Sequence, residues 1–413
     1  MPVTRRFSFL EEGDVAEITR KAVHVYDVHG NKVEREITES QVTHDAGDKG
    51  AFRHYMLKEI YEQPVAIQNT LDGRIANGKV LDAAFGENAA QLLPNVEHVQ
   101  IIACGTSYHA GMVSRYWFEE LADVSCNVEI ASEYRYRKSF VRANSLLVTI
   151  SQSGETADTY AALDLCNQND MKTCSIVNVV ESSIARDSNF VLPIHCGPEI
   201  GVASTKAFMG QMLVLYILVL KLGRLREDFD KETYLDKIKE LKKLPKLVED
   251  TLLTENKIQA VSGSFTDAKG SMFLGRGFSY PIALEGALKL KELAYVHAEG
   301  YPAGEMKHGP LALIEDGMPV VVLAPRDNYY KKTISNMQEV IARGAKVLLI
   351  TNKSKDEVFS ENIWETILVE SANDDLLPFL LTVPLQKLAY YSALKKGYDI
   401  DKPRNLAKSV TVE

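Results

Sequence analysis

The stretch HVQIIACGTSY, residues 98–108, has a form that recurs once later in the chain. An apolar run leads into Gly105, Thr106 and Ser107, and a helical pattern follows. The later stretch SMFLGRGFSY, residues 271–280, also ends in a glycine and a Ser-Tyr pair ahead of a helical pattern. A short continuous apolar run of this kind is typical of a strand buried on both faces of a parallel sheet. The recurrence predicts a duplicated α/β domain of about 130 residues.

Further apolar runs surround both copies of this stretch. They lie at 127–132, 145–151, 174–180 and 190–195 after the first copy, and at 318–324, 346–352 and 366–371 after the second. Strands that alternate with helical patterns predict two parallel sheets, each flanked by helices. We expect a long helix at 377–396 and a loop in the polar, proline-containing tail that follows it.

The same patterns divide the chain into six predicted regions. Short alternating runs predict a small β region that cannot hold a core by itself. The regions are 1–50 (β strands and linker), 51–90 (helical lead-in), 91–227 (first α/β domain), 228–261 (charge-rich helical connector), 262–396 (second α/β domain) and 397–413 (tail).

Composition excludes several classes of protein. Lys plus Arg number 47 and Asp plus Glu number 56, and the net charge of −9 argues against a general nucleic-acid or membrane-surface binder. The apolar run from Met212 to Leu220 is too short to span a bilayer. The five cysteines form no C-x-x-C pair, and the nine histidines form no H-E-x-x-H motif. We therefore expect reduced thiols, no metal site, no cofactor and a cytoplasmic protein.

Two predicted strand-to-helix turns are rich in small hydroxyl residues. One contains Gly105, Thr106 and Ser107, and the other is SQSGET, residues 151–156. Both follow a buried strand, where open parallel sheets bind ligands and where a helix N-terminus favours an anion. Neither turn matches a P-loop or a dinucleotide fingerprint. The absence of Lys and Arg from both favours a monophosphate pocket, and the alternative is that these residues only cap helices.

A second group of chemically active residues lies in the other half. Glu285, Lys289 and Glu292 are spaced to share one helix face, which also fits an exposed polar stripe. His308 follows in a segment bounded by glycine and proline, and histidine titrates near neutral pH. Lys408, in the tail, would matter only if the tail folded over a pocket, where desolvation could prepare it for imine formation.

Taken together, these segments resemble the synthase part of the glutamine–fructose-6-phosphate aminotransferase family. The resemblance rests on eight strings in the family's order: IIACGTSY, SRYWFE, VEIASEYRYRKS, SQSGETADT, EIGVASTKAF, LGRGFSYPIALEGALKLKE, PAGEMKHGPLALI and DKPRNLAKSVTVE. It covers the chain nearly end to end. It implies two tandem sugar-isomerase (SIS) domains and a short N-terminal β remnant of a glutaminase domain.

The resemblance also implies an activity, the conversion of fructose 6-phosphate and ammonia to glucosamine 6-phosphate in a homodimer. Lys408 would form an imine with the open sugar, Glu292 would move a proton between C1 and C2, and Lys289 would assist. His308, from the partner subunit, would open the sugar ring. Arg404 would lie in the tail that closes the site. The residues implied to bind substrate are Gly105, Thr106, Ser107, Ser151, Gln152, Ser153, Thr156, Val202, Ser204 and Ala407.

The chain departs from the family pattern at its start. The family's glutaminase nucleophile is an N-terminal cysteine, whereas the first cysteine here is Cys104. We therefore expect no glutaminase activity from this chain, and ammonia that is either free or supplied by a separate partner. Two alternatives stay open: a plain phosphosugar isomerase that needs no Lys408, and a sugar-phosphate sensor without catalysis.

Overall fold

The computed structural model describes residues 6–11, 13–39, 48–226, 229–354 and 362–412. Parts of the expected N-terminal region and of the charge-rich connector lie outside these residues. Residues 1–50 and residues 51–413 form two separate compact units.

The first unit is made of short strands, as predicted, and the structure shows that they pair in antiparallel fashion. β1 (Arg6–Ser8) pairs with β5 (Ile37–Glu39), and β3 (Val23–Tyr26) pairs with both β2 (Val15–Ile18) and β4 (Lys32–Val33). Apolar side chains of β2 and β3, among them Ile18, are exposed. This is consistent with a β region too small to bury a core of its own.

The first sheet of the second unit has five parallel strands at the predicted apolar runs. Its order is β12-β11-β10-β8-β9. The strands are β8 (His98–Ala103), β9 (Ser125–Ile130), β10 (Ser145–Ser151), β11 (Lys172–Val177) and β12 (Phe190–Pro193). The residues of β8 and nearly all of β10 are buried, as expected for strands covered on both faces.

The second sheet also has five parallel strands, in the order β14-β13-β15-β16-β17. The strands are β13 (Ser271–Gly275), β14 (Ala298–Pro302), β15 (Pro319–Leu323), β16 (Lys346–Asn352) and β17 (Glu365–Val369). β14 was not predicted, because AEGYP contains no apolar run. In both sheets, the second strand of the domain lies at one edge, followed by the first, third, fourth and fifth strands. This shared topology confirms the duplication.

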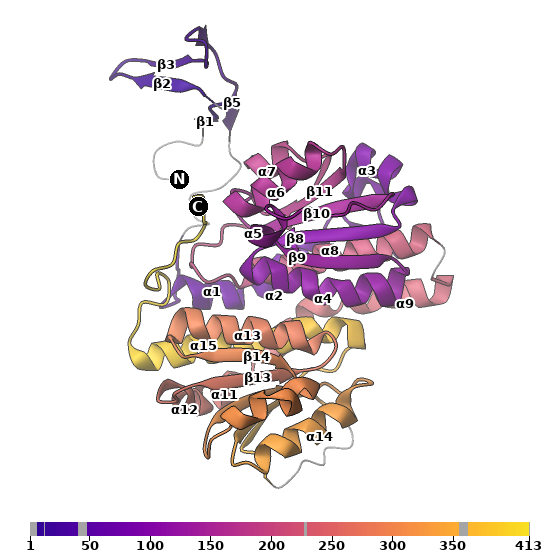
Figure 1. Ribbon diagram of the computed structural model, residues 1–413, viewed down its shortest axis with the longest axis vertical. Helices are drawn as coiled ribbons and strands as arrows, with labels where there is room; N and C mark the ends of the chain where they lie inside the picture. Colours follow the sequence, from indigo (N-terminus) through magenta and orange to yellow (C-terminus); the bar gives the residue numbers. More distant parts are fainter. Residues whose placement is uncertain (1–5, 12, 40–47, 227–228, 355–361, 413) are drawn as a thin grey trace. The chain divides into compact units, whose positions relative to one another are not determined.

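Helices cover both faces of each sheet, as Figure 1 shows. α4 (Gly105–Ala122) and α8 (Lys206–Leu225) pack against the first sheet, and α13 (Ser279–Ala294) and α15 (Leu377–Lys396) pack against the second. α4 also contacts α13, so these four helices form a layer between the sheets. The outer faces carry α5 (Ala131–Tyr134), α6 (Ala157–Asn167) and α7 (Ser183–Arg186) on the first sheet, and α14 (Tyr330–Ile341) on the second.

Shorter elements complete the second unit. The lead-in contains the helices α1 (Tyr55–Tyr61), α2 (Gln63–Leu71) and α3 (Gly86–Leu92) and a small hairpin of β6 (Ile75–Ala76) and β7 (Lys79–Val80), which was not predicted. The connector contains α9 (Lys231–Leu241), α10 (Leu244–Leu252), α11 (Glu255–Val261) and α12 (Gly263–Thr266). The 3-10 helices are η2 (Asp82–Ala84), η3 (Leu93–Asn95), η4 (Ala303–His308), η5 (Pro310–Leu313) and η6 (Asp374–Leu376).

The largest hydrophobic core lies in the central helix layer. Trp117 of α4 contacts Tyr216 of α8 and stacks on Phe379 of α15, with ring centroids 5.1 and 5.9 Å away.

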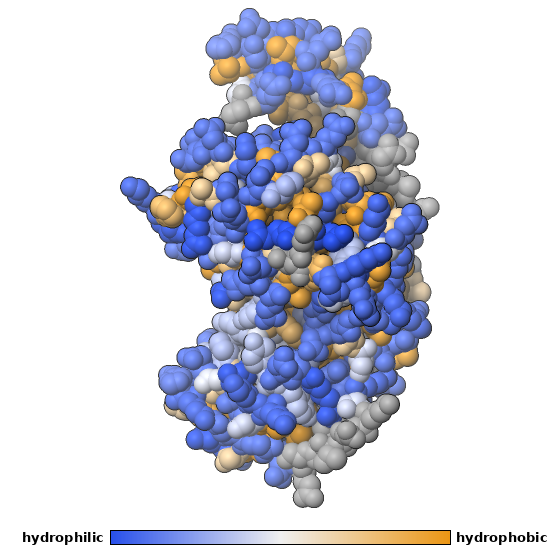
Figure 2. Space-filling model, turned by 90° about the vertical axis from the view of Figure 1, so that its right-hand side faces the viewer, coloured by the Kyte–Doolittle hydropathy of each residue, from blue (hydrophilic) through white to orange (hydrophobic). Residues whose placement is uncertain are grey.

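The apolar run from Met212 to Leu220 lies within α8, and this changes the expectation drawn from the length of the run. The whole of α8 has the length and composition of a membrane-spanning helix. Yet 83% of its apolar window is buried inside the protein, as in a core helix. The outer surface seen in Figure 2 is mainly hydrophilic.

Candidate active site

A cavity of about 120 Å³ lies at the carboxyl ends of β8 and β10. These strands are neighbours in the sheet, and the chain runs from β8 to β9 on one side before it returns to β10 on the other. Open α/β sheets bind ligands at such a point of reversal. The cavity is lined by Cys104, Thr106, Ser107, Ile150, Ser151, Gln152, Ser153, Thr156, Glu199, Val202, Ser204 and Lys408.

The turn after β10 is held by its own hydroxyl groups. Ser151 Oγ accepts a hydrogen bond of 3.0 Å from the Gly154 N–H and lies 2.8 Å from Thr156 Oγ1. Gly154 has a φ of +68°, and a Cβ at this position would lie 1.9 Å from Ser182 Oγ. Only glycine therefore fits this turn, which leads through Thr156 directly into the N-terminal end of α6.

The tail folds back over the cavity, as the prediction required. The Asp401 carboxylate accepts hydrogen bonds of 2.9 Å from the N–H groups of Tyr55 and Met56 at the start of α1. Farther along, Ser409 Oγ lies 2.8 Å from Ser153 Oγ, and the Val410 carbonyl accepts a hydrogen bond from Ala157. These contacts place Lys408 at the cavity although the tail forms no helix or strand within its described residues.

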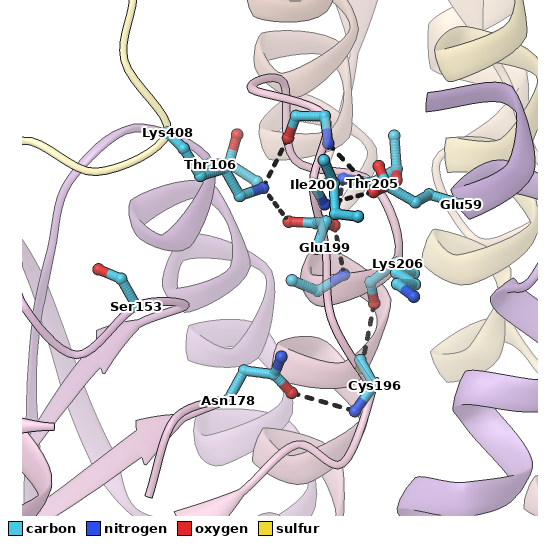
Figure 3. Close-up of polar contacts among 12 residues, drawn as sticks. Glu59, Thr106, Ser153, Asn178, Cys196, Glu199, Ile200, Thr205, Lys206 and Lys408 are labelled. Carbon is cyan, nitrogen blue, oxygen red and sulfur yellow. Dashed lines mark hydrogen bonds and ion pairs between the residues drawn. The ribbon is translucent and has the colours of Figure 1, made fainter. Parts of the chain in front are cut away.

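Lys408 makes two close polar contacts. Its Nζ donates to Glu199 Oε2 at 2.6 Å and to the Gly201 carbonyl at 2.8 Å. Figure 3 shows Lys408 reaching from the tail to Glu199, with Glu59 on the other side of the same loop. Burial raises the pKa of the Glu199 carboxyl, but Lys408 and three hydrogen bonds outweigh burial and bring that pKa below its usual value. Glu199 is therefore a buried carboxylate at the base of the cavity.

A second buried cluster reaches the cavity from α13. Glu285 Oε1 accepts a hydrogen bond of 3.0 Å from Thr106, and Glu285 Oε2 lies 2.7 Å from His109 Nδ1. Lys289 Nζ lies 3.5 Å from Glu285 and 2.5 Å from Glu292. Only 1–2% of the Glu285 and Lys289 side chains is exposed, so the alternative of an exposed polar stripe is wrong.

The charges in this cluster stabilise one another. Burial lowers the pKa of the Lys289 ammonium, but Glu292 and Glu285 outweigh burial and raise that pKa above its usual value. Burial raises the pKa of Glu285, whereas Lys289 and His109 outweigh it and lower that pKa. Lys289 is therefore a fixed positive charge, held between two carboxylates.

Comparisons with known proteins agree with this geometry. The SIS domain family matches residues 92–221 and 264–396, which contain the two sheets. Over the whole chain, the sequence is 55% identical to glutamine–fructose-6-phosphate aminotransferase [isomerizing] of Shewanella oneidensis and 54% identical to that of Escherichia coli K12, and it spans 68% of each. The chain belongs to the glutamine–fructose-6-phosphate aminotransferase family.

A solved structure gives the same assignment. The C-terminal domain of glucosamine-fructose-6-phosphate aminotransferase from Francisella tularensis has a TM-score of 0.84 and 45% identity. The similarity covers 86% of this chain and all of that domain. The chain thus contains the SIS part of this aminotransferase family, and the predicted α/β fold with two SIS domains is confirmed.

The structure does not bring every predicted residue to the cavity. His308 is exposed, at the end of η4 rather than in the predicted loop. Ala407 is exposed beside Lys408, and neither Ala407 nor Gly105 is among the cavity lining. Glu292 reaches the cavity only through Lys289, Glu285 and Thr106. Arg404 lies over the Tyr295 ring, 4.2 Å from its centroid.

Three residues near the site were missed. Glu199 lies within the quoted string EIGVASTKAF, and its position just before a run of small residues was the available signal. Glu59 and His109 lie within helical patterns, where nothing in the sequence marks them. Glu59 Oε1 accepts hydrogen bonds from the N–H groups of Ile200 and Gly201, which fixes the loop that carries Val202 and Ser204.

The matching turn of the second SIS domain is filled differently from that of the first. Gly277 corresponds to Gly105, and a Cβ there would lie 2.8 Å from the Tyr329 ring. Phe278, which is buried, replaces Thr106. A cavity of about 530 Å³ does lie in this domain, but at the amino ends of β13, β15 and β16, the opposite end from the ligand sites of open sheets.

The described residues contain no group of three or more His, Cys, Asp or Glu side chains placed to hold a metal ion.

Proposed function

We propose that this chain converts fructose 6-phosphate and ammonia to glucosamine 6-phosphate through an imine on Lys408. The observation that carries the proposal is that Lys408 lines the same small cavity as the hydroxyl groups of Ser151, Ser153 and Thr156. One cavity thus offers a phosphate-binding turn and a primary amine. The names of the relatives support fructose 6-phosphate as the substrate.

Lys289 and Lys408 are suited to different tasks. Lys289 lies between two carboxylates with 1% of its side chain exposed, so it stays charged and serves as an electrostatic group. Lys408 has one carboxylate partner and 26% of its side chain exposed. An amine must reach the carbonyl carbon to form an imine, and Lys408 is the lysine that lines the cavity.

Phosphate binding would fix the sugar against the N-terminal turns of α4 and α6. Hydroxyl donors and helix N-termini suit a dianionic phosphate without a positively charged side chain. The buried Ser204 hydroxyl lines the cavity and has no hydrogen-bond partner within the described part of the chain, which fits a role in holding a sugar hydroxyl.

Glu292 would transfer the proton between C1 and C2 of the sugar, and Lys289 would stabilise the charge on nearby oxygens. Neither side chain lines the cavity in this structure, so both roles need the bound sugar and this cluster to come together. A positioned base beside an imine, which withdraws electrons, is sufficient for ketose–aldose proton transfer. His308 is exposed, so its proposed role in ring opening needs a second subunit that brings it to the cavity. The homodimer, the cytoplasmic location and the use of free ammonia all belong to this proposal.

The function is tested by incubating the chain with fructose 6-phosphate and ammonium and measuring glucosamine 6-phosphate. We expect product with ammonium and none with glutamine. Lys408→Ala should abolish product, whereas Lys402→Ala, an exposed lysine of the same tail, should not change it. Isomerisation to glucose 6-phosphate that survives in Lys408→Ala would instead support a plain isomerase. Binding without turnover would support a sensor.

The shared site is tested by complementation. Lys408→Ala and His308→Ala variants should each be inactive, and mixing them should restore activity in heterodimers with one intact site. If the mixture stays inactive while the subunits exchange, His308 does not act across subunits.

A further inference from the structure

Two buried carboxylates, Glu59 and Glu199, both bind the loop that contacts Lys408, and the function proposed above uses neither. Glu199 lies on the loop between β12 and α8, and Glu59 reaches the same loop from α1 (Figure 3). The electrostatic influence of Glu199 contributes to raising the pKa of Glu59, so the two carboxyl groups are close enough to affect each other's protonation. Their position points to a role in proton transfer at Lys408.

The two carboxylate oxygens of Glu199 have different partners. Its Oε1 accepts hydrogen bonds of 2.9 and 3.0 Å from the N–H groups of Thr205 and Ala207 at the start of α8. Its Oε2 faces Lys408 Nζ at 2.6 Å, and the side chain is fully buried. Of the two groups that accept from Lys408, the Gly201 carbonyl cannot take up a proton. Glu199 is therefore the base in contact with the reacting nitrogen.

An imine cannot form from a lysine ammonium, because the nitrogen has no lone pair until a proton leaves. We propose that Glu199 takes this proton from Lys408 Nζ and returns it to the oxygen that leaves C2 of the sugar. The inference rests on the imine route of the proposed function.

The step balances without any further reactant. A proton moves from Nζ to Glu199 Oε2, and the freed lone pair of Nζ attacks C2 while the carbonyl electrons move to oxygen. The nitrogen of this adduct releases a second proton, and both protons reach the C2 oxygen, which leaves as water. The nitrogen lone pair then forms the second C–N bond of a protonated imine, and Glu199 is a carboxylate again.

The two carboxyl groups differ in the form that their surroundings favour. Lys408 and three hydrogen bonds lower the pKa of Glu199, so it rests as the carboxylate that can accept a proton. Burial and the nearby Glu199 raise the pKa of Glu59 to about 7. Glu59 Oε2 is buried and has no hydrogen-bond partner among the described residues, so it is available to carry a proton. The other titratable groups that act electrostatically with Glu199 are Lys408, Lys289 and the buried thiol of Cys196.

Quenched-flow trapping tests the proposal directly on imine formation. The chain is mixed with fructose 6-phosphate, quenched at set times with borohydride and examined by intact mass for the reduced adduct on Lys408. In Glu199→Gln, Oε1 still accepts from the α8 N–H groups but the base is lost. We expect adduct formation at pH 7 to slow by about 100-fold or more. It should recover toward the native rate near pH 10, where bulk solvent deprotonates lysine.

Matched variants separate this role from a structural one. Glu62→Gln removes a carboxylate that pairs with Lys206, and this variant should form the trapped adduct at the native rate. Glu199→Asp, a carboxylate with a shorter reach, should trap faster than Glu199→Gln at pH 7. Thermal melting and isothermal titration with fructose 6-phosphate report whether each variant folds and binds.

The possible results are distinct. If Glu199→Gln forms the adduct at the native rate at pH 7, the proposal is overturned. It is also overturned if the rate of adduct formation falls by the same factor at every pH, because that result indicates that Glu199 only positions Lys408. If the native chain itself gives no adduct, the imine route fails, and this inference fails with it. If Glu199→Gln does not fold, Glu199→Asp is compared with the native chain at pH 7 and pH 10, and a loss of the same size at both pH values would count against a proton acceptor at this position.

Discussion

The Thr106 hydroxyl of the first SIS domain donates a hydrogen bond of 3.0 Å to the Glu285 carboxylate of the second. Thr106 lines the candidate cavity, whereas Glu285 lies on α13 beside Lys289. This bond joins the turn after β8, where we propose that phosphate binds, to the charged cluster of the other domain. The duplication has therefore produced one composite site, with the pocket in the first domain and additional charged groups from the second.

Removing Glu285 should destabilise the protein strongly. Glu285→Ala leaves Lys289 buried with one carboxylate and leaves His109 and Thr106 without their shared acceptor. Breaking a buried ion pair from one side costs roughly 3–5 kcal/mol. Chemical denaturation should show this loss, whereas Glu119→Ala, which breaks the exposed pair with Arg115, should change the free energy of unfolding by less than about 0.5 kcal/mol. A mild effect of Glu285→Ala would mean that Lys289 finds another partner.

Removing the Ser151 hydroxyl should weaken substrate binding. Ser151→Ala removes the acceptor of the Gly154 N–H and the partner of Thr156, so it loosens the turn and deletes a donor to phosphate. A hydrogen bond to a charged group contributes about 1.5–3 kcal/mol, so KM for fructose 6-phosphate should rise by roughly 10-fold or more. Ser145→Ala, at the other end of β10, is the control and should leave KM unchanged. An unchanged KM in Ser151→Ala would place the phosphate elsewhere.

The sheets could be predicted from sequence because their strands are local apolar runs. The exception, β14, is an edge strand that contains Gly300 and Pro302. Gly300 is required by packing, since a Cβ there would lie 2.8 Å from the Leu284 backbone of α13. That constraint comes from tertiary contact, and no pattern within AEGYP reveals it.

The candidate site was predictable only where the residue types were unusual for their position. The hydroxyl-rich turns follow strands, so their residues indicated a pocket. The spacing of Glu285 and Lys289 placed them on one helix face, but whether that face is exposed depends on the packing of α4 against α13. The closure of the tail depends on Asp401 binding the start of α1, far away in the sequence.

Glu59→Gln should stabilise the protein in a pH-dependent way. Burial, together with Glu199, raises the pKa of Glu59 from 4.5 to about 7 in the folded state. The folded protein therefore binds more protons than the unfolded chain between pH 4.5 and 7, so this group lowers stability as pH rises through that window. Glutamine removes this cost and can still accept from the N–H groups of Ile200 and Gly201.

The gain in melting temperature of Glu59→Gln over the native chain should thus be near zero at pH 4.5 and largest at pH 7 and above. Glu87→Gln, an exposed position on α3, should show no such trend. A gain that does not depend on pH would mean that Glu59 is ionised throughout this range.

Replacing Lys387, a buried residue of α15, should reveal a second pH-dependent contribution to the free energy of unfolding. Its side chain is fully buried, and its Nζ donates to the Leu252 carbonyl at 2.6 Å and to the Tyr61 hydroxyl at 3.1 Å. Burial lowers the pKa of Lys387 from 10.5 to about 8. The cost of burying the charge is fully present below pH 8 and disappears as the pH rises to 10.5, so the native chain gains stability across that window.

Lys387→Met should remove this cost while it fills a similar volume. We expect about 1 kcal/mol more stability than native at pH 7, after the lost hydrogen bonds are subtracted from the gain. The advantage should vanish or reverse above pH 10, where the native lysine is neutral. Lys395→Met, on the exposed side of the same helix, is the control for a change of charge alone. The test is a set of melting curves of the three proteins from pH 7 to 10.5. A Lys387→Met chain less stable than native at pH 7 would show that the hydrogen bonds to Leu252 and Tyr61 and the ion pair with Glu255 together outweigh the cost of burial.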